Sequence, residues 1–313
     1  MQIAVHIGLL VGGLALALAA SEVAVSYTRA LAAALRAPAF VVGVVLVALG
    51  TDLPEIANSI AAHLQGEGDV NVGDSVGSTL TQYTFVLGLF PLVVSVIVIS
   101  RRQVGLVTVL TVVGLATTAV VVADGDLGRV DGIVLVALWA GATWLVARLL
   151  PGQVHDEPPH VRVSSRAGQA AVVLSSLVVV GAGATVAVRA LVQLAEELGV
   201  PEFAIAFFGA SLGTSAPEIV VDITALMRGA PAIALGDALG SSLIDATLSI
   251  GIGPIVQPAP VTVRLAVVGA LYTLAAVAVV GGLLVARRRH DRRTGAVFVS
   301  LYVLSYVVIV AAD

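Results

Sequence analysis

The stretch GTDLPEI at residues 50–56 decides the fold, because it returns almost unchanged as GTSAPEI at residues 213–219. A second segment, GDSVGSTL at 73–80, returns as GDALGSSL at 236–243 with the same offset of 163 residues (213 − 50 and 236 − 73). Without any gap, 14 of the 34 positions in 49–82 are identical to those in 212–245. Self-similarity at a fixed offset indicates a duplicated structural unit. The two halves of the chain are therefore expected to contain the same elements.

The composition indicates an integral membrane protein. Hydrophobic residues make up 58% of the 313 residues, charged residues only 12%, and the mean hydropathy is +1.06. Apolar runs of about 20 residues, enough to cross a hydrocarbon layer of about 30 Å as a helix, follow one another along nearly the whole chain. There are no cysteines, which excludes a disulfide framework and a thiolate metal site. All 16 basic residues are arginine, and nothing suggests nucleic-acid binding.

The pattern of apolar runs predicts an all-α protein with ten transmembrane helices. The N-terminal run is expected to stay as a helix, since it has no basic segment before it and the repeat requires it. The polar, Pro-rich stretch 150–168 is interpreted as a linker between two five-helix halves, 1–149 and 169–313, within one membrane domain. Its two histidines, His155 and His160, are better interpreted as part of a solvated connector than as metal ligands. The predicted spans are 3–34, 38–64, 70–99, 103–123, 130–149, 169–197, 201–227, 232–257, 263–286 and 295–312.

The distribution of arginine predicts the orientation. Twelve of the 16 arginines fall on one side of the predicted spans, and the opposite side has only Arg129 and Arg264. Because cytoplasmic loops carry the excess of positive charge, both termini are expected outside a cell membrane and the central linker inside. The twelve are Arg36, Arg101, Arg102, Arg148, Arg162, Arg166, Arg228, Arg287, Arg288, Arg289, Arg292 and Arg293.

The repeated windows locate a candidate ion site. With five helices per half, the second copy enters the membrane from the opposite side, an arrangement that places binding sites at the interface of the repeats. Gly50 and Pro54 are expected to break their helix and to free backbone carbonyls, because proline has no amide donor. Glu55 and Glu218 follow the two prolines directly, and an ionisable residue in the membrane is a functional candidate by default.

The second segment adds oxygen ligands on one helical face. Ser78 and Gln82 are four residues apart, as are Ser241 and Asp245. Together the two halves offer six or more oxygens, which suits Ca²⁺, since it takes six to eight oxygen ligands at about 2.3–2.6 Å. Zinc and copper favour the histidine and cysteine that these windows lack.

The pair of segments, G-T-x-x-P-E followed by G-x-x-x-G-S and present twice, resembles the calcium/cation antiporter superfamily, in particular its prokaryotic sodium/calcium exchangers. The resemblance covers essentially the whole chain. It implies an antiporter, not an enzyme, in which Na⁺ and Ca²⁺ compete for overlapping sites and the first and sixth helices slide. We expect a monomer in the lipid bilayer that transports ions and holds no resident cofactor. Carried over by position, the ligands are Glu55, Glu218 and Asp245, with contributions from Thr51, Ser78, Thr214, Ser215 and Ser241.

The chain departs from the family pattern in its first repeat. Asp52 stands where the family typically has serine, and Gln82 where it has asparagine. Asp52 adds a fourth carboxylate, which Ca²⁺ would neutralise only halfway, so one acid is expected to hold a proton or a further cation. We hypothesise that Asp52 makes transport more proton-dependent or alters its stoichiometry. Asp74 and Asp237 replace a common asparagine, and two interpretations stay open for them: an acidic lining of the ion passages, or N-caps near helix starts.

Other functions fit the sequence less well. An intramembrane aspartyl protease would carry a G-x-G-D segment and a Tyr-Asp pair, but Ala234 and Leu235 precede Gly236 and no Tyr-Asp pair exists. Proton/calcium exchangers of the superfamily usually carry G-N-x-x-E-L, whereas this chain has serine at 78 and 241, which favours sodium coupling. Exchange of H⁺, K⁺ or another divalent cation remains an alternative, and an uncoupled channel fits poorly with four carboxylates.

Overall fold

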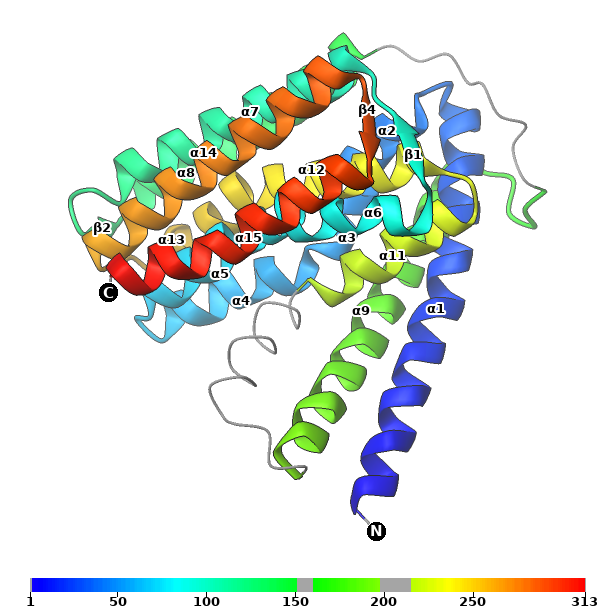
Figure 1. The fold of residues 1–313 in the computed structure, drawn as a ribbon, viewed down its shortest axis with the longest axis horizontal. Coiled ribbons are helices and arrows are strands. Elements are labelled where there is room, and N and C mark those ends of the chain that lie inside the picture. Colours follow the sequence, from blue (N-terminus) through cyan, green and yellow to red (C-terminus); the bar gives the residue numbers. More distant parts are fainter. Residues whose placement is uncertain (1, 151–159, 198–214, 313) are drawn as a thin grey trace.

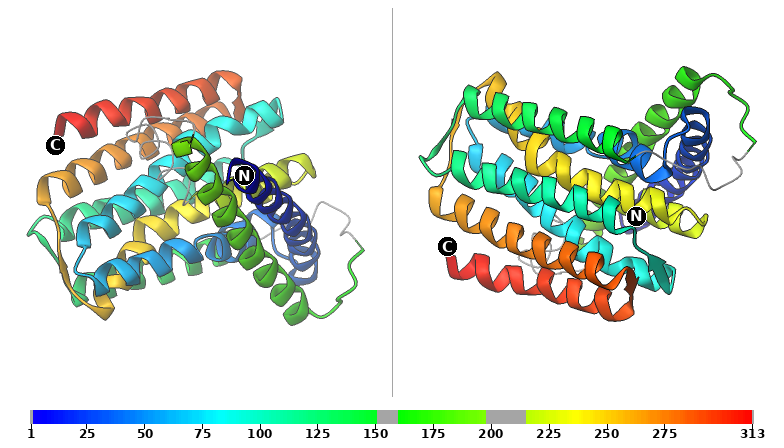
Figure 2. Two further views of the ribbon diagram at one scale, coloured as in Figure 1. Left: turned by 90° about the horizontal axis from the view of Figure 1, so that it is seen from below. Right: turned by 90° about the horizontal axis from the view of Figure 1, so that it is seen from above.

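The computed structural model describes residues 2–150, 160–197 and 215–312. Within them the chain is almost entirely helical, as predicted. Two long helices, α1 (Gln2–Leu35) and α9 (Arg166–Glu197), lie side by side and project from the remaining helices (Figures 1 and 2). The helices cross closely because Gly13 and Gly183 have no side chain: a Cβ on Gly13 would lie 2.7 Å from the Gly183 carbonyl oxygen.

Most of the other elements occur twice, and the bounds of the two copies differ by 163 residues, the offset of the sequence repeat, to within three residues. The first half contains α2 (Ala39–Val42), η1 (Gly43–Val47), α3 (Ala48–Thr51), α4 (Leu53–Leu64), α5 (Gly68–Thr81), η2 (Gln82–Val86), α6 (Leu87–Val93), β1 (Val96–Val98), α7 (Arg101–Val121), β2 (Asp126–Leu127) and α8 (Arg129–Leu149). The second half contains α11 (Ala216–Met227), α12 (Pro231–Ile244), η3 (Asp245–Ser249), α13 (Ile250–Val256), β3 (Ala259–Pro260), α14 (Val263–Arg287), β4 (Arg289–Asp291) and α15 (Arg292–Ala312). The elements labelled η are π-helical segments.

The predicted helix break is present in the first repeat. The helix Ala39–Thr51 and the helix Leu53–Leu64 meet at Asp52 with a bend of 46°. Pro54 lies in the first turn of α4, where a proline costs no hydrogen bond. The predicted free carbonyls are not seen at two positions beside the break: the Asp52 amide donates to the Ala48 carbonyl (3.0 Å), and the Ile56 amide donates to the Asp52 carbonyl (3.0 Å). Both oxygens keep helical partners despite the bend.

Left-handed residues mark equivalent turns in the two repeats. The chain turns after α4 at Gly66 (φ 78°) and after α11 at Gly229 (φ 67°), the conformation in which glycine carries no Cβ penalty. A second equivalent pair is mixed: Gly125 (φ 88°) follows α7, but Arg288 (φ 55°) follows α14. The repeat therefore conserves backbone geometry even where the residue type differs.

Seven described helices are long and apolar enough to cross a membrane, and the bent pair around Asp52 makes an eighth if it counts as one span. These eight agree closely with eight of the ten predicted spans. Of the other two, 201–227 lies largely outside the described residues and 295–312 is part of helix α15. The predicted helix 70–99 ends early, because the chain becomes extended after Val93 and forms strand β1.

Two short antiparallel strand pairs join the halves. Strand β1 pairs with β4, and β2 pairs with β3, so each pair takes one strand from each half. Figure 1 shows β1 and β4 at one end of the helix bundle and β2 at the other. The sequence analysis did not predict these strands.

Helix α12 lies at the centre of the bundle and is buried from Ile233 to its end. It packs on α2 and η1 through glycines: a Cβ on Gly236 would lie 2.3 Å from the Phe40 carbonyl oxygen, and one on Gly240 would lie 2.6 Å from the Val44 Cα. Any larger residue would therefore force the two helices apart. This contact brings the second segment of the second repeat, 236–243, against the residues that directly precede the first segment of the first repeat.

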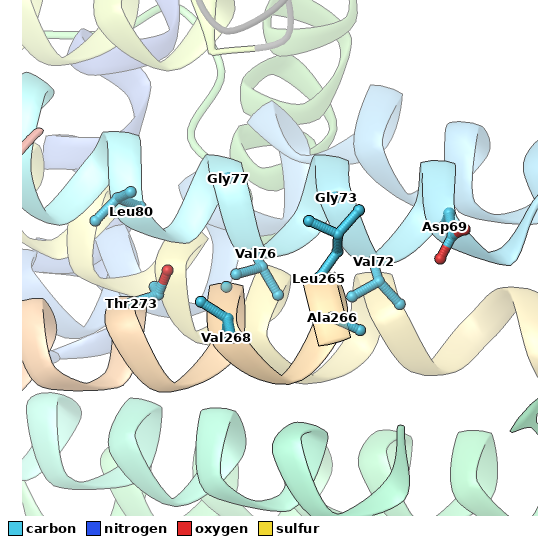
Figure 3. Close-up of a pocket in the computed structure, with 11 residues that line it drawn as sticks. Asp69, Val72, Gly73, Val76, Gly77, Leu80, Leu265, Ala266, Val268 and Thr273 are labelled. Carbon is cyan, nitrogen blue, oxygen red and sulfur yellow. The ribbon is translucent and has the colours of Figure 1, made fainter. Parts of the chain in front are cut away.

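A nearly apolar cavity of about 260 Å³ lies between α5 and α14 (Figure 3). Its lining does not include the group of acids described in the next section. Asp69 lies at one end of it, and the rest of its described lining is glycine, aliphatic side chains and one threonine. Such a lining offers too few oxygens to bind a hard cation. The lining residues are Asp69, Val72, Gly73, Val76, Gly77, Leu80, Leu265, Ala266, Val268, Gly269 and Thr273.

Candidate cation site

Three carboxylates meet where the repeats face each other. Asp52 lies at the bend between α3 and α4, Glu55 is in the first turn of α4, and Glu218 is in the first turn of α11. One oxygen from each lies within 4.8 Å of the others. All three are buried, with Glu218 fully so. Two oxygens on opposite sides of a Ca²⁺ ion are about 4.6–5.2 Å apart, so one ion fits this spacing.

The local sequence explains why the acids point inward. Each glutamate directly follows a proline in the first helical turn, at the amino end of a helix, where the dipole favours negative charge. The corresponding helix starts, Leu53 and Ala216, differ by the repeat offset. Two half-helices therefore direct the same residue type, Glu55 and Glu218, toward one point from different halves of the chain.

Asp245 lies beside this group, outside the 4.8 Å set. It is the first residue of η3, is buried, and interacts electrostatically with Asp52 and Glu55. Neither of its carboxylate oxygens has a hydrogen-bond partner among the described residues. The π-helical turn shifts the residues that follow it around the helix axis, a device often found at functional sites. Asp245 thus completes a buried group of four acids.

The predicted neutral ligands differ in their contacts. The Thr51 hydroxyl lies 3.2 Å from Asp237 Oδ1 and 3.4 Å from the Ser241 hydroxyl. Gln82 Oε1 and the Ser215 hydroxyl are buried without a partner in the described structure. Ser78 is buried on α5, four residues before Gln82. Thr214 lies outside the described residues.

Two further acids lie next to the group. Asp222, four residues after Glu218 on α11, faces Asp237 on α12 within hydrogen-bonding reach. The sequence analysis missed Asp222, and the only signal was the acid itself in an apolar helix, because the repeat has Ser59 at that position. The N-cap interpretation of Asp74 and Asp237 is wrong, since their helices begin earlier, at Gly68 and Pro231. Both acids lie inside helices.

Six buried acids in a membrane require compensation. A charged carboxylate in hydrocarbon costs at least a few kcal/mol unless it is paired. The described ion pairs with arginine lie elsewhere: Arg287 and Arg289 pair with Asp291 in β4, and Arg228 pairs with Glu22. No described arginine forms a salt bridge with the central acids. Cations supplied from solution, whether metal ions or protons, are the compensation that this arrangement can accept.

Helices α1 and α11 are joined by polar contacts at the edge of this region. The Ser21 and Thr224 hydroxyls are 2.7 Å apart and buried, and Glu22 lies 2.5 Å from Arg228. The sequence analysis did not identify the partner of Glu22. These contacts connect the long helix pair to the helix that carries Glu218.

The fold and these acids define a class: a multi-pass membrane transporter of cations. The family match makes it specific. Residues 5–148 and again 168–311 match the family described as "Sodium/calcium exchanger protein", with starts and ends that both differ by 163 residues (168 − 5 and 311 − 148). The chain belongs to this family. It is a calcium/cation antiporter and not an enzyme.

Named relatives are distant but cover most of the chain. Inner membrane protein YrbG of Escherichia coli is 29% identical over 264 residues, 80% of this chain and 79% of the relative. Sodium/calcium exchanger MaX1 of Methanosarcina acetivorans is 23% identical over 298 residues, 82% of this chain and 85% of the relative. A solved structure of the sodium-calcium exchanger NCX_Mj, at 23% identity, covers 97% of this chain and 99% of its own, with a TM-score of 0.81. This likeness establishes the fold.

Proposed function

We propose that the protein exchanges Ca²⁺ for Na⁺ across the cell membrane, using the buried acids as the shared ion site. The observation that carries the proposal is the meeting of Asp52, Glu55 and Glu218, with an oxygen from each within 4.8 Å of the others. Asp245, Ser78, Gln82, Thr51, Thr214, Ser215 and Ser241 complete the proposed ligand set. Overlapping ligands suit an exchanger, because occupation by one ion excludes the other.

The proposed architecture is ten spans in two inverted five-helix repeats, 1–149 and 169–313, joined by a cytoplasmic linker at 150–168. The equal offsets of the elements support it. The arginine distribution favours both termini outside the cell, and Arg101, Arg102 and the tract Arg287–Arg293 lie around the β1–β4 end of the bundle. We propose that the protein works as a monomer in the bilayer.

Alternating access requires part of the molecule to move relative to the ion site. The projecting pair α1 and α9 is the best candidate, because it stands apart from the central helices (Figure 1). Two of its described links to α11 are the Ser21–Thr224 and Glu22–Arg228 contacts. Sliding of this pair is proposed to open the site to each side in turn.

Proton coupling is the second candidate, and Asp52 favours it. A fourth carboxylate beside Glu55 and Glu218 raises the negative charge beyond what one Ca²⁺ neutralises. Serine at 78 and 241 favours Na⁺. A relative from Alkalimonas amylolytica, 28% identical over 228 residues, is named only a putative antiporter, CaxA, and leaves the coupling ion open.

The test is ⁴⁵Ca²⁺ uptake into proteoliposomes under an imposed Na⁺ gradient and, separately, an imposed pH gradient. We expect uptake with the outward Na⁺ gradient and none with the pH gradient alone. Uptake driven only by the pH gradient would replace Na⁺ by H⁺ as the coupling ion. The variant Glu55→Gln with Glu218→Gln should lose uptake while keeping its chromatographic profile in detergent. Full activity of that variant would exclude the proposed site.

A further inference from the structure

Asp222 and Asp237 form a second acidic pair beside the central acids. Both side chains have an exposed fraction of 0%. They come from different helices, α11 and α12, and their carboxyl groups face each other within hydrogen-bonding reach. Two ionised carboxylates do not take up this position unless a proton or a metal ion lies between them, because nothing else offsets their repulsion in a buried site.

The first repeat shows the ordinary solution at the equivalent place. Asp74 is the counterpart of Asp237 at the repeat offset, and its carboxylate accepts a hydrogen bond from the Asn58 amide (2.7 Å). That pair is only partly buried. In the second repeat Val221 takes the position of Asn58, the carboxylate of the next residue, Asp222, faces Asp237 instead, and the pair is fully enclosed. The first repeat therefore has a hydrogen bond between Asn58 and Asp74, whereas the second repeat has two acceptors, Asp222 and Asp237, facing each other.

The oxygens of this pair lack other partners. Both carboxylate oxygens of Asp222 and Oδ2 of Asp237 have no hydrogen-bond donor among the described residues. Oδ1 of Asp237 lies 3.2 Å from the Thr51 hydroxyl. That hydroxyl also lies 3.2 Å from the Val47 carbonyl and 3.1 Å from the Ala48 carbonyl, and its single proton serves one acceptor at a time. The group is a cluster of buried acceptors whose single nearby donor among the described residues is the Thr51 hydroxyl.

We propose that Asp222, Asp237 and the Thr51 hydroxyl form a further site for a monovalent hard cation, Na⁺ in the proposed exchange cycle. The proposal deepens the proposed function and rests on it for the identity of the ion. Thr51 links the new site to the central one, since its hydroxyl also lies 3.4 Å from that of Ser241. The residue that would bind the additional Na⁺ thus also contacts the central ligand set.

The ligand count favours a monovalent over a divalent ion. Ca²⁺ takes six to eight oxygens, and this pair with Thr51 supplies at most five side-chain oxygens even if both carboxylates are bidentate. A single positive charge between two carboxylates suffices to hold them together. It also leaves less repulsion toward a Ca²⁺ ion bound by Asp52, Glu55 and Glu218. An additional Na⁺ ion increases the charge moved in each cycle.

The experiment counts bound Na⁺ without relying on transport. The melting temperature of the purified protein in detergent is measured against Na⁺ concentration, with choline keeping ionic strength constant. Each ion bound only by the folded state adds RT to the slope of stability against ln[Na⁺] near saturation. The variant Asp222→Asn gives Asp237 an amide partner of the type that Asn58 provides for Asp74, and we expect its slope to fall by about one ion per chain. Asp222→Glu, which keeps the charge, should keep the slope.

Other outcomes overturn the proposal. Equal slopes for the wild type and Asp222→Asn would mean that the pair holds a permanent proton. Binding of two ⁴⁵Ca²⁺ ions per chain, reduced to one by Asp222→Asn, would make the site divalent. If Asp222→Asn does not fold, Asp237→Asn serves in its place. Failure of the proposed function would show separately, as no Na⁺-driven ⁴⁵Ca²⁺ uptake by the wild type. The slopes of stability against ln[Na⁺] would still report how many Na⁺ ions bind.

Discussion

The two repeats have nearly the same backbone, but they carry their acidic and neutral side chains at different equivalent positions. In the first repeat the acid lies at the helix break, as Asp52, and an amide, Gln82, begins the π-helical turn. In the second repeat a hydroxyl, Ser215, precedes the half-helix, and the acid, Asp245, begins the π-helical turn. To the central group of four acids, each repeat thus supplies one aspartate besides its glutamate, at a different position. The comparison teaches that the duplication fixes where ligands lie, while their charge is free to vary.

The same exchange is seen at the starts of helices α8 and α15. Asp131 of the first repeat accepts a hydrogen bond from the Gly128 amide (2.9 Å) at the start of α8. In the second repeat Asp291 takes the position of Gly128, and Thr294 takes that of Asp131. Asp291 Oδ1 accepts from the Thr294 amide (3.2 Å), and the Thr294 hydroxyl accepts from the Asp291 amide (2.9 Å). The acid has again moved from one position of the repeat to another.

The largest effect is expected from removing the acid of the second π-helical turn. Asp245→Asn takes a carboxylate from the ligand set, and we expect Ca²⁺ affinity to fall at least about tenfold, because affinity follows ligand charge. Adding Gln82→Asp to the same chain restores the charge at the equivalent position of the other repeat. We expect that double variant to recover to within about threefold of the wild type. The measurement is the Ca²⁺ concentration dependence of ⁴⁵Ca²⁺ uptake.

Gln82→Asp alone is the matched control, because it adds a charge without removing one. A double variant that is folded but no better than Asp245→Asn would show that the two π-helical turns are not equivalent. The different positions of the aspartate in the two repeats would then have no functional meaning.

A smaller effect on affinity, and a larger one on coupling, is expected for Asp52→Ser. This substitution gives the first break the residue type of the second, Ser215. Removing Asp52 costs one ligand but relieves repulsion with Glu55 and Glu218, so we expect Ca²⁺ affinity to fall only about threefold. The number of coupling ions and the pH profile of uptake should change. Both are read from the membrane potential at which net ⁴⁵Ca²⁺ flux stops, measured at several pH values. An unchanged zero-flux potential and pH profile would contradict the role assigned to Asp52.

The sequence predicted the features that recur at the repeat offset. The pairing of Glu55 with Glu218 followed from the duplicated G-T-x-x-P-E segment, and the break followed from Pro54, which cannot continue a helix from the preceding turn. Where the structure describes both ends of a predicted span, the bounds were right to within a few residues, apart from the end of 70–99, because membrane thickness sets the length of the apolar runs. These inferences needed only local chemistry and one internal alignment.

Features without a local signal were missed. Asp222 has no acidic counterpart in the first repeat, so only the packing of α11 on α12 shows that it meets Asp237. Each π-helical turn contains one residue more than an α-helical turn. The residue types in Gln82–Val86 give no signal of this extra residue. Strand β1 lies in a run of β-branched residues that reads equally well as the end of a membrane helix. Tertiary contacts decide each of these cases.

A modest, pH-dependent effect is expected at the start of α15. Hydrogen bonds from Arg289, then from the Thr294 amide, and the charge of Arg287 lower the pKa of Asp291 below its ordinary value. A carboxylate with a lowered folded pKa stabilises the fold above its unfolded pKa of about 3.9 and loses that contribution as pH falls through the folded pKa. Asp291→Asn should therefore lower the melting temperature by about 2–4 °C at pH 7.

The difference between wild type and Asp291→Asn should shrink as the pH falls below about 4, because the Asp291 carboxylate then protonates in the unfolded chain while it stays ionised in the folded one. Asp131→Asn is the comparison in the first repeat. A constant difference from pH 7 to pH 3 would mean that Asp291 acts through packing and not through its charge.

The smallest effect is expected at the turn after α7 and α14, where both equivalent positions are described and differ in residue type. Arg288 follows α14 with φ 55°, whereas its counterpart Gly125 follows α7 with φ 88°. A residue with a Cβ pays about 1–2 kcal/mol in this conformation. Arg288→Gly removes that strain, but glycine also gives the unfolded chain more conformational freedom, which lowers the free energy of unfolding by about 0.4–1 kcal/mol. The net gain in the free energy of unfolding therefore stays below about 1.5 kcal/mol. We expect the melting temperature to rise by about 1–3 °C.

Arg288→Ala removes the same charge and keeps the Cβ, so it should give no rise, and Gly125→Ala should lower the melting temperature. If Arg288→Ala stabilises as much as Arg288→Gly, relief of charge among the neighbouring arginines is the cause, and the backbone conformation at this turn is not strained.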